Sequence, residues 1–283
     1  MSIPSDSCCL VVGATNPTSI GYQTALTLLQ AGVHHVSIMG RNQEKLDKAV
    51  LLLSTIGGTG KVSGVLGDLK KPESMKKVVE EACEQMGGKL DCLICCGGNG
   101  YSEYLGLDVS DLESYRLMQN VAILSPMVLA EAAFPHLHES KNPGGGTIVM
   151  VGSVSADVPW PNTAPHNFAM AGKNTMMQTL AFKYRRENVR VNLVAAGVIH
   201  SGALDTMAKK KNIPVETYAA LRADSQPLGR NGTLEDVSNA VLYLASPASG
   251  FTTGEIIRVD GGLHLSNWWN RQVMLKEYVG GSS

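Results

Sequence analysis

A glycine-containing turn near the N-terminus is the first stretch whose residue types and spacing indicate chemistry. Gly13 follows the apolar run Cys9–Val12, and Gly21 stands at the start of an amphipathic run. At a strand-to-helix junction, small residues let backbone N–H groups approach a ligand, and the helix N-terminus favours a pyrophosphate. The spacing departs from G-x-G-x-x-G, so a surface turn that begins with glycine remains the alternative. The turn predicts a phosphate-bearing cofactor that contacts Gly13, Thr15, Ser19, Ile20 and Gly21.

Later strand ends carry residues that suit the rest of a nucleotide. Arg41 follows the second apolar run, where no acidic residue is present to hold a ribose 2′-hydroxyl. An arginine there suits a 2′-phosphate and favours NADPH over NADH, although a solvated Arg41 is the alternative. Asp68 could accept a hydrogen bond from an adenine amino group or cap the following helix. The further cofactor contacts predicted at these strand ends are Arg41, Asp68, Leu69, Cys96, Gly97 and Gly98.

These residues need a scaffold, and the chain alternates between strand-like and helix-like patterns. Seven strands are predicted at Cys9–Val12, His35–Met39, Lys61–Leu66, Leu90–Cys96, Thr147–Val151, Val189–Val194 and Glu255–Val259. The helices between them are predicted at Tyr22–Ala31, Glu44–Leu53, Pro72–Met86, Asp111–Leu137, Ala164–Arg186 and Thr233–Ala245. Such alternation is typical of an α/β fold with a doubly wound parallel sheet, the Rossmann fold. No repeat or linker interrupts the pattern, so residues 1–283 are expected to form a single domain.

Composition limits the partners and the environment. The chain has 283 residues, 44% of them hydrophobic, a net charge of -1 and a pI near 6.7. This balance argues against nucleic-acid and membrane-surface partners. No apolar run approaches the roughly 18 residues of a spanning helix, and the N-terminus lacks a signal-sequence pattern. We expect a cytoplasmic protein with no membrane partner.

Six cysteines are present, and two of them have the C-x-x-C spacing of redox and metal sites at Cys92 and Cys95. Both belong to the apolar strand Leu90–Cys96, where alternate side chains face opposite ways. Free cysteine in such a strand behaves as a small hydrophobe. We therefore expect reduced, packed thiols and no metal site.

Taken together, these motifs resemble those of the short-chain dehydrogenases/reductases over Leu10 to Gly262. The resemblance rests on the glycine turn, Asp68, the glycines after the fourth strand, Asn120, Ser153, Lys173, Arg190-Val191-Asn192 and Val259-Asp260-Gly261-Gly262. It implies a nicotinamide cofactor, with further contacts to it from Gly197 and Ile199 after the sixth strand. It also implies a catalytic asparagine at Asn120, a serine at Ser153 or Ser155, and a lysine at Lys173. Each serine is suited to hydrogen-bond a substrate oxygen.

One element of the family's active site is missing. The family places a tyrosine four residues before the lysine, and this position holds Ala169. The enoyl-acyl-carrier-protein reductases, a second branch, place their tyrosine seven residues before the lysine, which here is His166. The sequence resembles that branch in two other places, the Ser19-Ile20 pair in the glycine turn and Ala196-Gly197 after the sixth strand. The resemblance therefore favours this branch, with histidine at the tyrosine position.

Helix geometry supports a histidine substitute. Residues seven apart lie nearly two full turns apart, so His166 and Lys173 share a helix face. The helix N-terminus and the lysine charge both disfavour imidazolium, so we expect a neutral His166 that donates a hydrogen bond to a substrate oxygen. Ala169 lies between them and is expected to leave room. The alternative is that His166 is a helix-start residue without chemistry and that the site has decayed.

The substrate side is less specific. Residues 198–228 resemble the family's substrate lid, and residues 263–283 form a tail that is longer than usual. Lys209, Lys210 and Lys211 could attract an acyl phosphopantetheine, although a solvated helix end is the alternative. Apolar candidates for the pocket are Tyr101, Tyr104, Trp160, Met207, Trp268 and Trp269. The resemblance also implies a homodimer or homotetramer formed through the two long helices.

Two functions of different kind follow. The first is an NADPH-dependent reductase that transfers hydride to an activated C=C or carbonyl of a small-molecule or acyl-thioester substrate. In it, Lys173 seats the cofactor, and His166 or an ordered water assists at the oxygen. The second is a redox-neutral nucleotide-binding enzyme, such as an isomerase or cyclase, or a non-catalytic binding protein. The missing tyrosine keeps the second hypothesis open.

Overall fold

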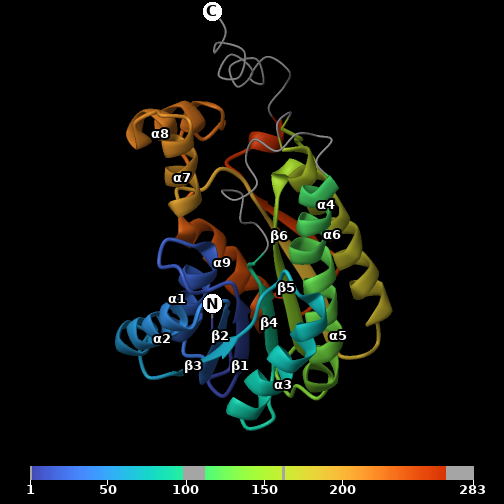
Figure 1. The fold of residues 1–283 in the computed structure, drawn as a ribbon. Coiled ribbons are helices and arrows are strands. Elements are labelled where there is room, and N and C mark those ends of the chain that lie inside the picture. Colours follow the sequence, from blue (N-terminus) through green and yellow to red (C-terminus); the bar gives the residue numbers. More distant parts are fainter. Residues whose placement is uncertain (1, 98–111, 161–162, 266–283) are drawn as a thin grey trace, which may run out of the picture.

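A single parallel sheet of seven strands forms the centre of the molecule (Figure 1). The computed structural model describes residues 2–97, 112–160 and 163–265. The strands are β1 Cys8–Val12, β2 His35–Gly40, β3 Lys61–Leu66, β4 Cys92–Cys95, β5 Gly146–Ser153, β6 Val189–Ala196 and β7 Ile256–Val259. Their order across the sheet is β3-β2-β1-β4-β5-β6-β7, and every neighbouring pair is parallel. This order confirms the predicted doubly wound Rossmann fold.

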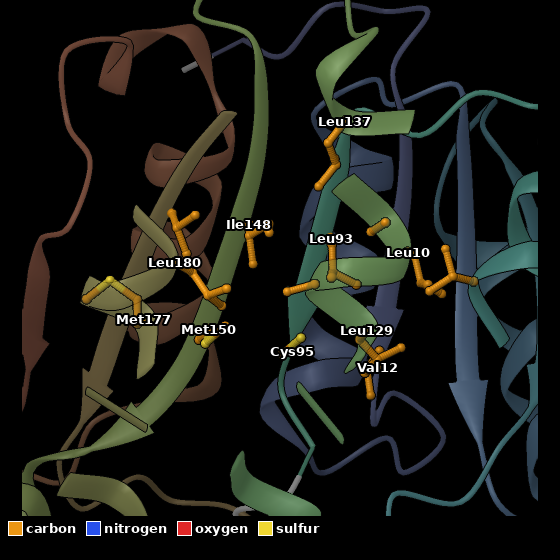
Figure 2. Packing of buried hydrophobic residues seen from close by; sticks show 14 of the residues in the cluster. Leu10, Val12, Leu93, Cys95, Leu129, Leu137, Ile148, Met150, Met177 and Leu180 are labelled. Atoms are coloured by element: carbon orange, nitrogen blue, oxygen red, sulfur yellow. The ribbon is translucent and has the colours of Figure 1, made fainter. Parts of the chain in front are cut away.

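Helices cover both faces of the sheet (Figure 1). One face packs against α1 Ile20–Gln30, α2 Gln43–Ile56 and α9 Leu234–Ala245, and the other against α3 Met75–Gln85, α5 Ser125–His138 and α6 Ala164–Lys183. Strand side chains alternate between the two layers, which is why the central strands are apolar throughout. Leu10 and Val12 of β1 face the α5 layer, where Leu129 of α5 lies beside Val12, and Leu180 of α6 packs near Met150 in the same cluster (Figure 2). Cys9 and Val11 face the opposite layer.

The sequence predicted one long helix over Asp111–Leu137, before β5. The structure shows that this helix is not a continuous α-helix. It consists of α4 Leu112–Gln119, a π-helical turn at Asn120–Leu124, and α5. Pro126 lacks the N–H that would bond four residues back, and Ser125 N–H bonds instead to the carbonyl of Asn120. The irregular turn therefore falls at the predicted site residue Asn120.

The segment 198–228 contains two helices that the sequence did not predict, α7 Gly202–Lys210 and α8 Val215–Asp224. They lie together at one end of the molecule, apart from the layer helices (Figure 1). Leu204 and Ala208 of α7 pack with Tyr218 of α8 in a small apolar cluster. Lys209 and Lys210 are exposed in the last turn of α7, which matches a solvated helix end.

All six cysteines are buried and unbonded to one another. Burial raises the pKa of Cys95 and of Cys96 to about 12, so both remain thiols. Within residues 2–97, 112–160 and 163–265, no three His, Cys, Asp or Glu side chains come together as a metal site would require. Cys92 and Cys95 are buried in the two core clusters, so the packing predicted for this pair is confirmed.

Among the described residues, one helix, Leu112–His138, is long and apolar enough to cross a membrane. A core helix passes the same test of length and composition. Leu129 and Leu137, which are fully buried, place its second half in the core beneath the sheet (Figure 2).

Candidate functional site

The order of the strands reverses between β1 and β4, and this is where the sheet forms a crevice. The chain runs outward from β1 to β3 and then returns to place β4 on the other side of β1. In doubly wound sheets, ligands bind beyond the carboxyl ends of the strands at such a point. A cavity lies there, and the predicted cofactor residues that line it are Gly13, Thr15, Ser19, Arg41, Asp68, Leu69 and Gly97.

Three glycines let the backbone segments of this crevice approach one another. Gly13 has a φ of +84°, and a Cβ on it would lie 2.8 Å from Cα of Gly97. A Cβ on Gly97 would clash with the side chain of Leu69, and a Cβ on Gly21 would clash with the carbonyl oxygen of Gly13. Backbone atoms therefore exclude a side chain at 13 and 21, whereas at 97 the flexible Leu69 side chain would have to move. Gly21 does not line the cavity, so its role here is packing.

The crevice is also built for a phosphate-bearing ligand at its polar end. Ser19 is the N-cap of α1, and its Oγ accepts from Tyr22 N–H at 3.3 Å, so the helix N-terminus faces the glycine turn. Asp68 Oδ1 accepts from Lys70 N–H at 3.0 Å, which organises the turn after β3. The exposed Arg41 lines the same cavity. A dinucleotide fits this arrangement of a glycine cradle, a helix N-terminus and a cation.

A second cavity lies between the ends of β5 and β6 and the helices α7 and α8. Its lining brings together several predicted site residues that are far apart in the sequence, namely Ile20, Ser153, Ser155, His166, Gly197 and Ile199. Trp160 and Met207, predicted as apolar lining, are also present there. Gly98, Tyr101, Tyr104, Trp268 and Trp269 lie outside the described residues.

His166 reaches the second cavity from the first turn of α6. Pro165 occupies the helix start, and Asn167 Nδ2 donates to the carbonyl of Trp160 at 2.7 Å, which fixes the chain before the helix. The imidazole is 4% exposed, and burial, followed by the charge of Lys173, lowers its pKa to about 3. His166 is therefore neutral at neutral pH. Burial is the main cause, which the sequence could not show.

Lys173 lies deeper than the resemblance implied. Its side chain is fully buried, and Nζ donates to the carbonyl of Val151 in β5 at 2.9 Å. Burial lowers its pKa to about 8, while the nearby Cys95 and Cys96 act in the opposite direction. The ammonium lines neither main cavity.

The two serines after β5 differ in what they can offer a ligand. Ser153 Oγ accepts from Ser155 N–H at 3.1 Å and caps the short turn there. Ser155 Oγ is buried and makes no hydrogen bond within the part of the chain that the structure describes. Ser155 is therefore the better hydrogen-bonding group of the two for a molecule in the cavity.

Two more predicted site residues, Asn120 and Cys96, lie beside the cavities and not in them, as Lys173 does. Asn120 Nδ2 donates to the carbonyl of Lys70 at 3.4 Å, which ties the π-helical turn to the segment after β3. Cys96 is buried, with its thiol 3.9 Å from Thr24 Oγ1. Ala169 was expected to leave room, and instead it is fully buried in a cluster with Met118, Val121, Ala122 and Met170. Among the described residues, the family's tyrosine position is therefore packed against apolar side chains.

Among the residues of the second cavity that the sequence did not predict are Tyr218 and Arg222 of α8. Both are buried, at 1% and 7% exposure. The guanidinium carbon of Arg222 lies 4.0 Å from the ring centroid of Trp160. Their spacing of four residues places them on one face of a helix. This spacing could have indicated a shared location, but only if a helix had been predicted here.

Comparison with known proteins agrees with this architecture. The sequence model described as Enoyl-(Acyl carrier protein) reductase matches residues 13–264. A tropinone reductase homolog of Arabidopsis thaliana is 30% identical over 259 residues, which cover 92% of this chain and 92% of that protein. A short-chain type dehydrogenase/reductase from Mycobacterium ulcerans has a structure with a TM-score of 0.83 at 27% identity, covering 99% of this chain and 98% of the other.

A further likeness concerns the fold alone. The L-sorbose reductase of Gluconobacter frateurii, solved with NADPH and L-sorbose, has a TM-score of 0.81 at 23% identity, over 94% of this chain and 99% of that one. Three findings support one family assignment: the glycine turn where the strand order reverses, the second cavity beside it, and the match over residues 13–264. The chain belongs to the short-chain dehydrogenase/reductase family of NAD(P)-dependent oxidoreductases.

Proposed function

We propose that the protein is an NADPH-dependent reductase that transfers hydride to an activated C=C or carbonyl of a small molecule or acyl thioester. One observation carries this proposal: Ser19 lines the cofactor crevice and the next residue, Ile20, lines the second cavity, so the two cavities lie next to each other at the start of α1. A ligand in the first cavity is therefore adjacent to a ligand in the second. Such adjacency is what hydride transfer requires.

Cofactor binding is assigned to the first cavity. Backbone groups of the glycine turn and the N-terminus of α1 would hold the pyrophosphate. Arg41 would bind the 2′-phosphate of NADPH, because Arg41 and Asn42, which directly follow β2, include no carboxylate for a ribose hydroxyl. When bound, NADPH supplies the hydride. Lys173 would act on the nicotinamide ribose indirectly, because its Nζ bonds to the carbonyl of Val151 in β5, below the site.

The substrate oxygen is assigned to His166 and Ser155. Both line the second cavity, and both carry hydrogen-bond donors in their neutral forms. With a pKa of about 3, His166 cannot supply a proton as imidazolium at neutral pH. It stabilises developing negative charge by hydrogen bonding, and water delivers the proton. Enolates form in C=C reduction and need a weaker acid than alkoxides do, which favours activated substrates.

A second candidate function is redox-neutral catalysis or nucleotide binding without turnover. The observation in its favour is Ala169, which supplies no phenol at the family's tyrosine position and is fully buried in an apolar cluster. The full burial of Lys173 on a backbone carbonyl points in the same direction. Both functions share the cofactor crevice, so nucleotide binding alone does not separate them.

Substitution of Arg41 tests the cofactor assignment. We expect Arg41→Ala to weaken NADPH binding by about tenfold or more, since a charge-assisted bond contributes roughly 1.5–3 kcal/mol, and to leave NADH binding nearly unchanged. Fluorescence titration of both nucleotides measures this. Lys45→Ala, on the exposed side of α2, is the control for general charge loss. Equal weakening of both nucleotides, or of neither, would contradict the assignment.

A further inference from the structure

One amide side chain connects two parts of the second-cavity wall. Trp160 and His166 both line this cavity, and both are buried. Asn167 directly follows His166, and its Nδ2 donates to the carbonyl of Trp160 at 2.7 Å. Its Oδ1 accepts from Thr163 Oγ1 at 3.1 Å. The Asn167 amide therefore joins Trp160 to the start of α6, the helix that carries His166.

The hydroxyl of Thr163 contributes to this connection and not to the helix end. Thr163 is the N-cap of α6, a position at which a threonine hydroxyl ordinarily accepts from an N–H of the first turn and stabilises the helix. Within the described residues, Thr163 makes no such capping bond. Its hydroxyl is buried and donates to Asn167. The start of α6 lacks a side-chain cap, and the hydroxyl holds the Asn167 amide in place.

Trp160 also contacts the helix on the other side of the cavity. The guanidinium carbon of Arg222, in α8, lies 4.0 Å from the centroid of its ring. A displacement of Trp160 would therefore change the cavity wall and the packing of α8 together. Asn167 lines neither main cavity, as the described residues form them. It can act on a bound molecule only through Trp160 and His166.

We propose that Asn167 is a positioning residue whose amide sets the placement of the His166 imidazole and the Trp160 indole around a substrate in the second cavity. This inference rests on the proposed function, because it takes His166 as a donor to the substrate oxygen. Without the amide, the carbonyl of Trp160 and the hydroxyl of Thr163 each lose a hydrogen-bond partner. The cavity wall and the start of α6 are then no longer held together, and water reaches the imidazole.

The protonation state of His166 tests this arrangement without turnover. Nitrogen NMR spectra of the imidazoles are recorded at pH 7 and pH 5, and the His166 signal is assigned by its loss in His166→Gln. We expect a neutral imidazole at both pH values in the unaltered protein. In Asn167→Ala we expect a largely protonated imidazole at pH 5, because its pKa returns towards 6.5 once burial is lost. Lys173 of α6 and Arg222 of α8, the cations nearest to this site, are unchanged in the variant.

Substitutions of Thr163 and Asn174 separate positioning from general damage to α6. Thr163→Val removes the hydroxyl at nearly constant shape and should act as Asn167→Ala does. Thr163→Ser keeps the hydroxyl and should keep the imidazole neutral at pH 5. Asn174→Ala, two turns further along α6, is the matched control and should change nothing. Circular dichroism shows whether each variant is folded. A neutral His166 at pH 5 in folded Asn167→Ala or Thr163→Val would overturn the proposal.

Turnover distinguishes this proposal from the proposed function. With any substrate that the unaltered protein reduces, Asn167→Ala should lower kcat by about 10- to 100-fold, because a displacement of about 1 Å can have an effect of this size. NADPH binding should be unchanged, since Asn167 lies outside the cofactor crevice. Equal kcat in both proteins would contradict the positioning role. No turnover of any substrate by the unaltered protein would contradict the proposed function, while the NMR comparison would still test whether Asn167 holds His166.

Discussion

At the scale of single residues, His166 links the stability of the fold to pH. Burial lowers its pKa from the ordinary 6.5 to about 3, so between these values the unfolded chain binds a proton that the folded chain does not. The stability that this histidine contributes is fully present above about pH 6.5 and is lost as the pH falls towards 3. A shift of this size corresponds to about 5 kcal/mol at most, since each pH unit is worth about 1.4 kcal/mol, and about 3 kcal/mol of it is lost between pH 7 and pH 4.

Urea unfolding at pH 7 and pH 4 measures the effect. We expect the unaltered protein to lose about 3 kcal/mol more between these pH values than His166→Gln, which carries no titrating group at this position. The exposed His34 provides the matched control, since His34→Gln should keep the full pH dependence. Identical pH dependence in the unaltered protein and His166→Gln would show that the imidazole is not held neutral by burial.

Ala169 gives the second prediction at this scale. Restoring the family's tyrosine by Ala169→Tyr should destabilise the protein by about 3 kcal/mol or more, because the position is filled by α4 and the π-helical turn. Reductase activity should not rise. Ala171→Tyr, on the exposed side of the same helix, should change stability by about 0.5 kcal/mol or less. A stable Ala169→Tyr protein with increased turnover would mean that the position is open to substrate.

The sequence indicated part of the site and missed the rest for physical reasons. Ser155 follows the buried strand β5, and His166 lies in the first turn of α6, the next long helix. Their common location therefore follows from chain order and sheet topology. The depth of Lys173 depends on the packing of α6 against β5, which spacing along one helix does not reveal. Arg222 reads as an ordinary surface arginine until α8 folds over Trp160.

At the scale of elements, the glycine turn gives a test in which backbone strain and close approach are separable. In Gly13→Ala, alanine would have to adopt a φ of +84°, and its Cβ would lie 2.8 Å from Cα of Gly97. In Gly32→Ala, alanine would have to adopt a φ of +91°, but no atom would lie within 4 Å of its Cβ. We expect Gly32→Ala to cost about 1–2 kcal/mol and to leave NADPH binding unchanged.

Gly13→Ala should cost more than Gly32→Ala and should weaken NADPH binding by at least 100-fold, because the β1 turn must move away from β4. Thermal unfolding and nucleotide titration of the two variants provide the comparison. If Gly13→Ala binds NADPH normally, the turn does not form the cofactor cradle.

The elements that the sequence predicted well are those with one dominant signal. Central strands buried on both faces are continuous apolar runs, and β1, β2, β5 and β6 were found within two residues of their ends. Helices α7 and α8 were not predicted, because they pack chiefly on each other and on the cavity and show only a narrow apolar face. The π-helical turn arises from a single missing N–H at Pro126 and leaves no periodic signal.

At the scale of the whole molecule, α6 carries exposed aromatic side chains that are unusual for a solvated surface. Phe168 and Phe182 are 59% and 69% exposed, and Phe168 meets Tyr115 of α4 edge to face. We propose that this face joins copies of the chain in a homodimer or homotetramer. Sedimentation velocity should show an oligomer that Phe168→Glu with Phe182→Glu converts to monomer. A monomer before any substitution would contradict this assembly.

We propose that hydride passes from bound NADPH to a substrate held by His166 and Ser155. The loss of NADPH absorbance tests this with a panel of enoyl thioesters, β-keto thioesters, cyclic ketones and oxo acids, for the unaltered protein and His166→Ala. We expect turnover with at least one substrate and a fall in kcat of about tenfold or more in the variant, while NADPH binding is kept. Tight NADPH binding without oxidation by any substrate would contradict it and would favour redox-neutral chemistry.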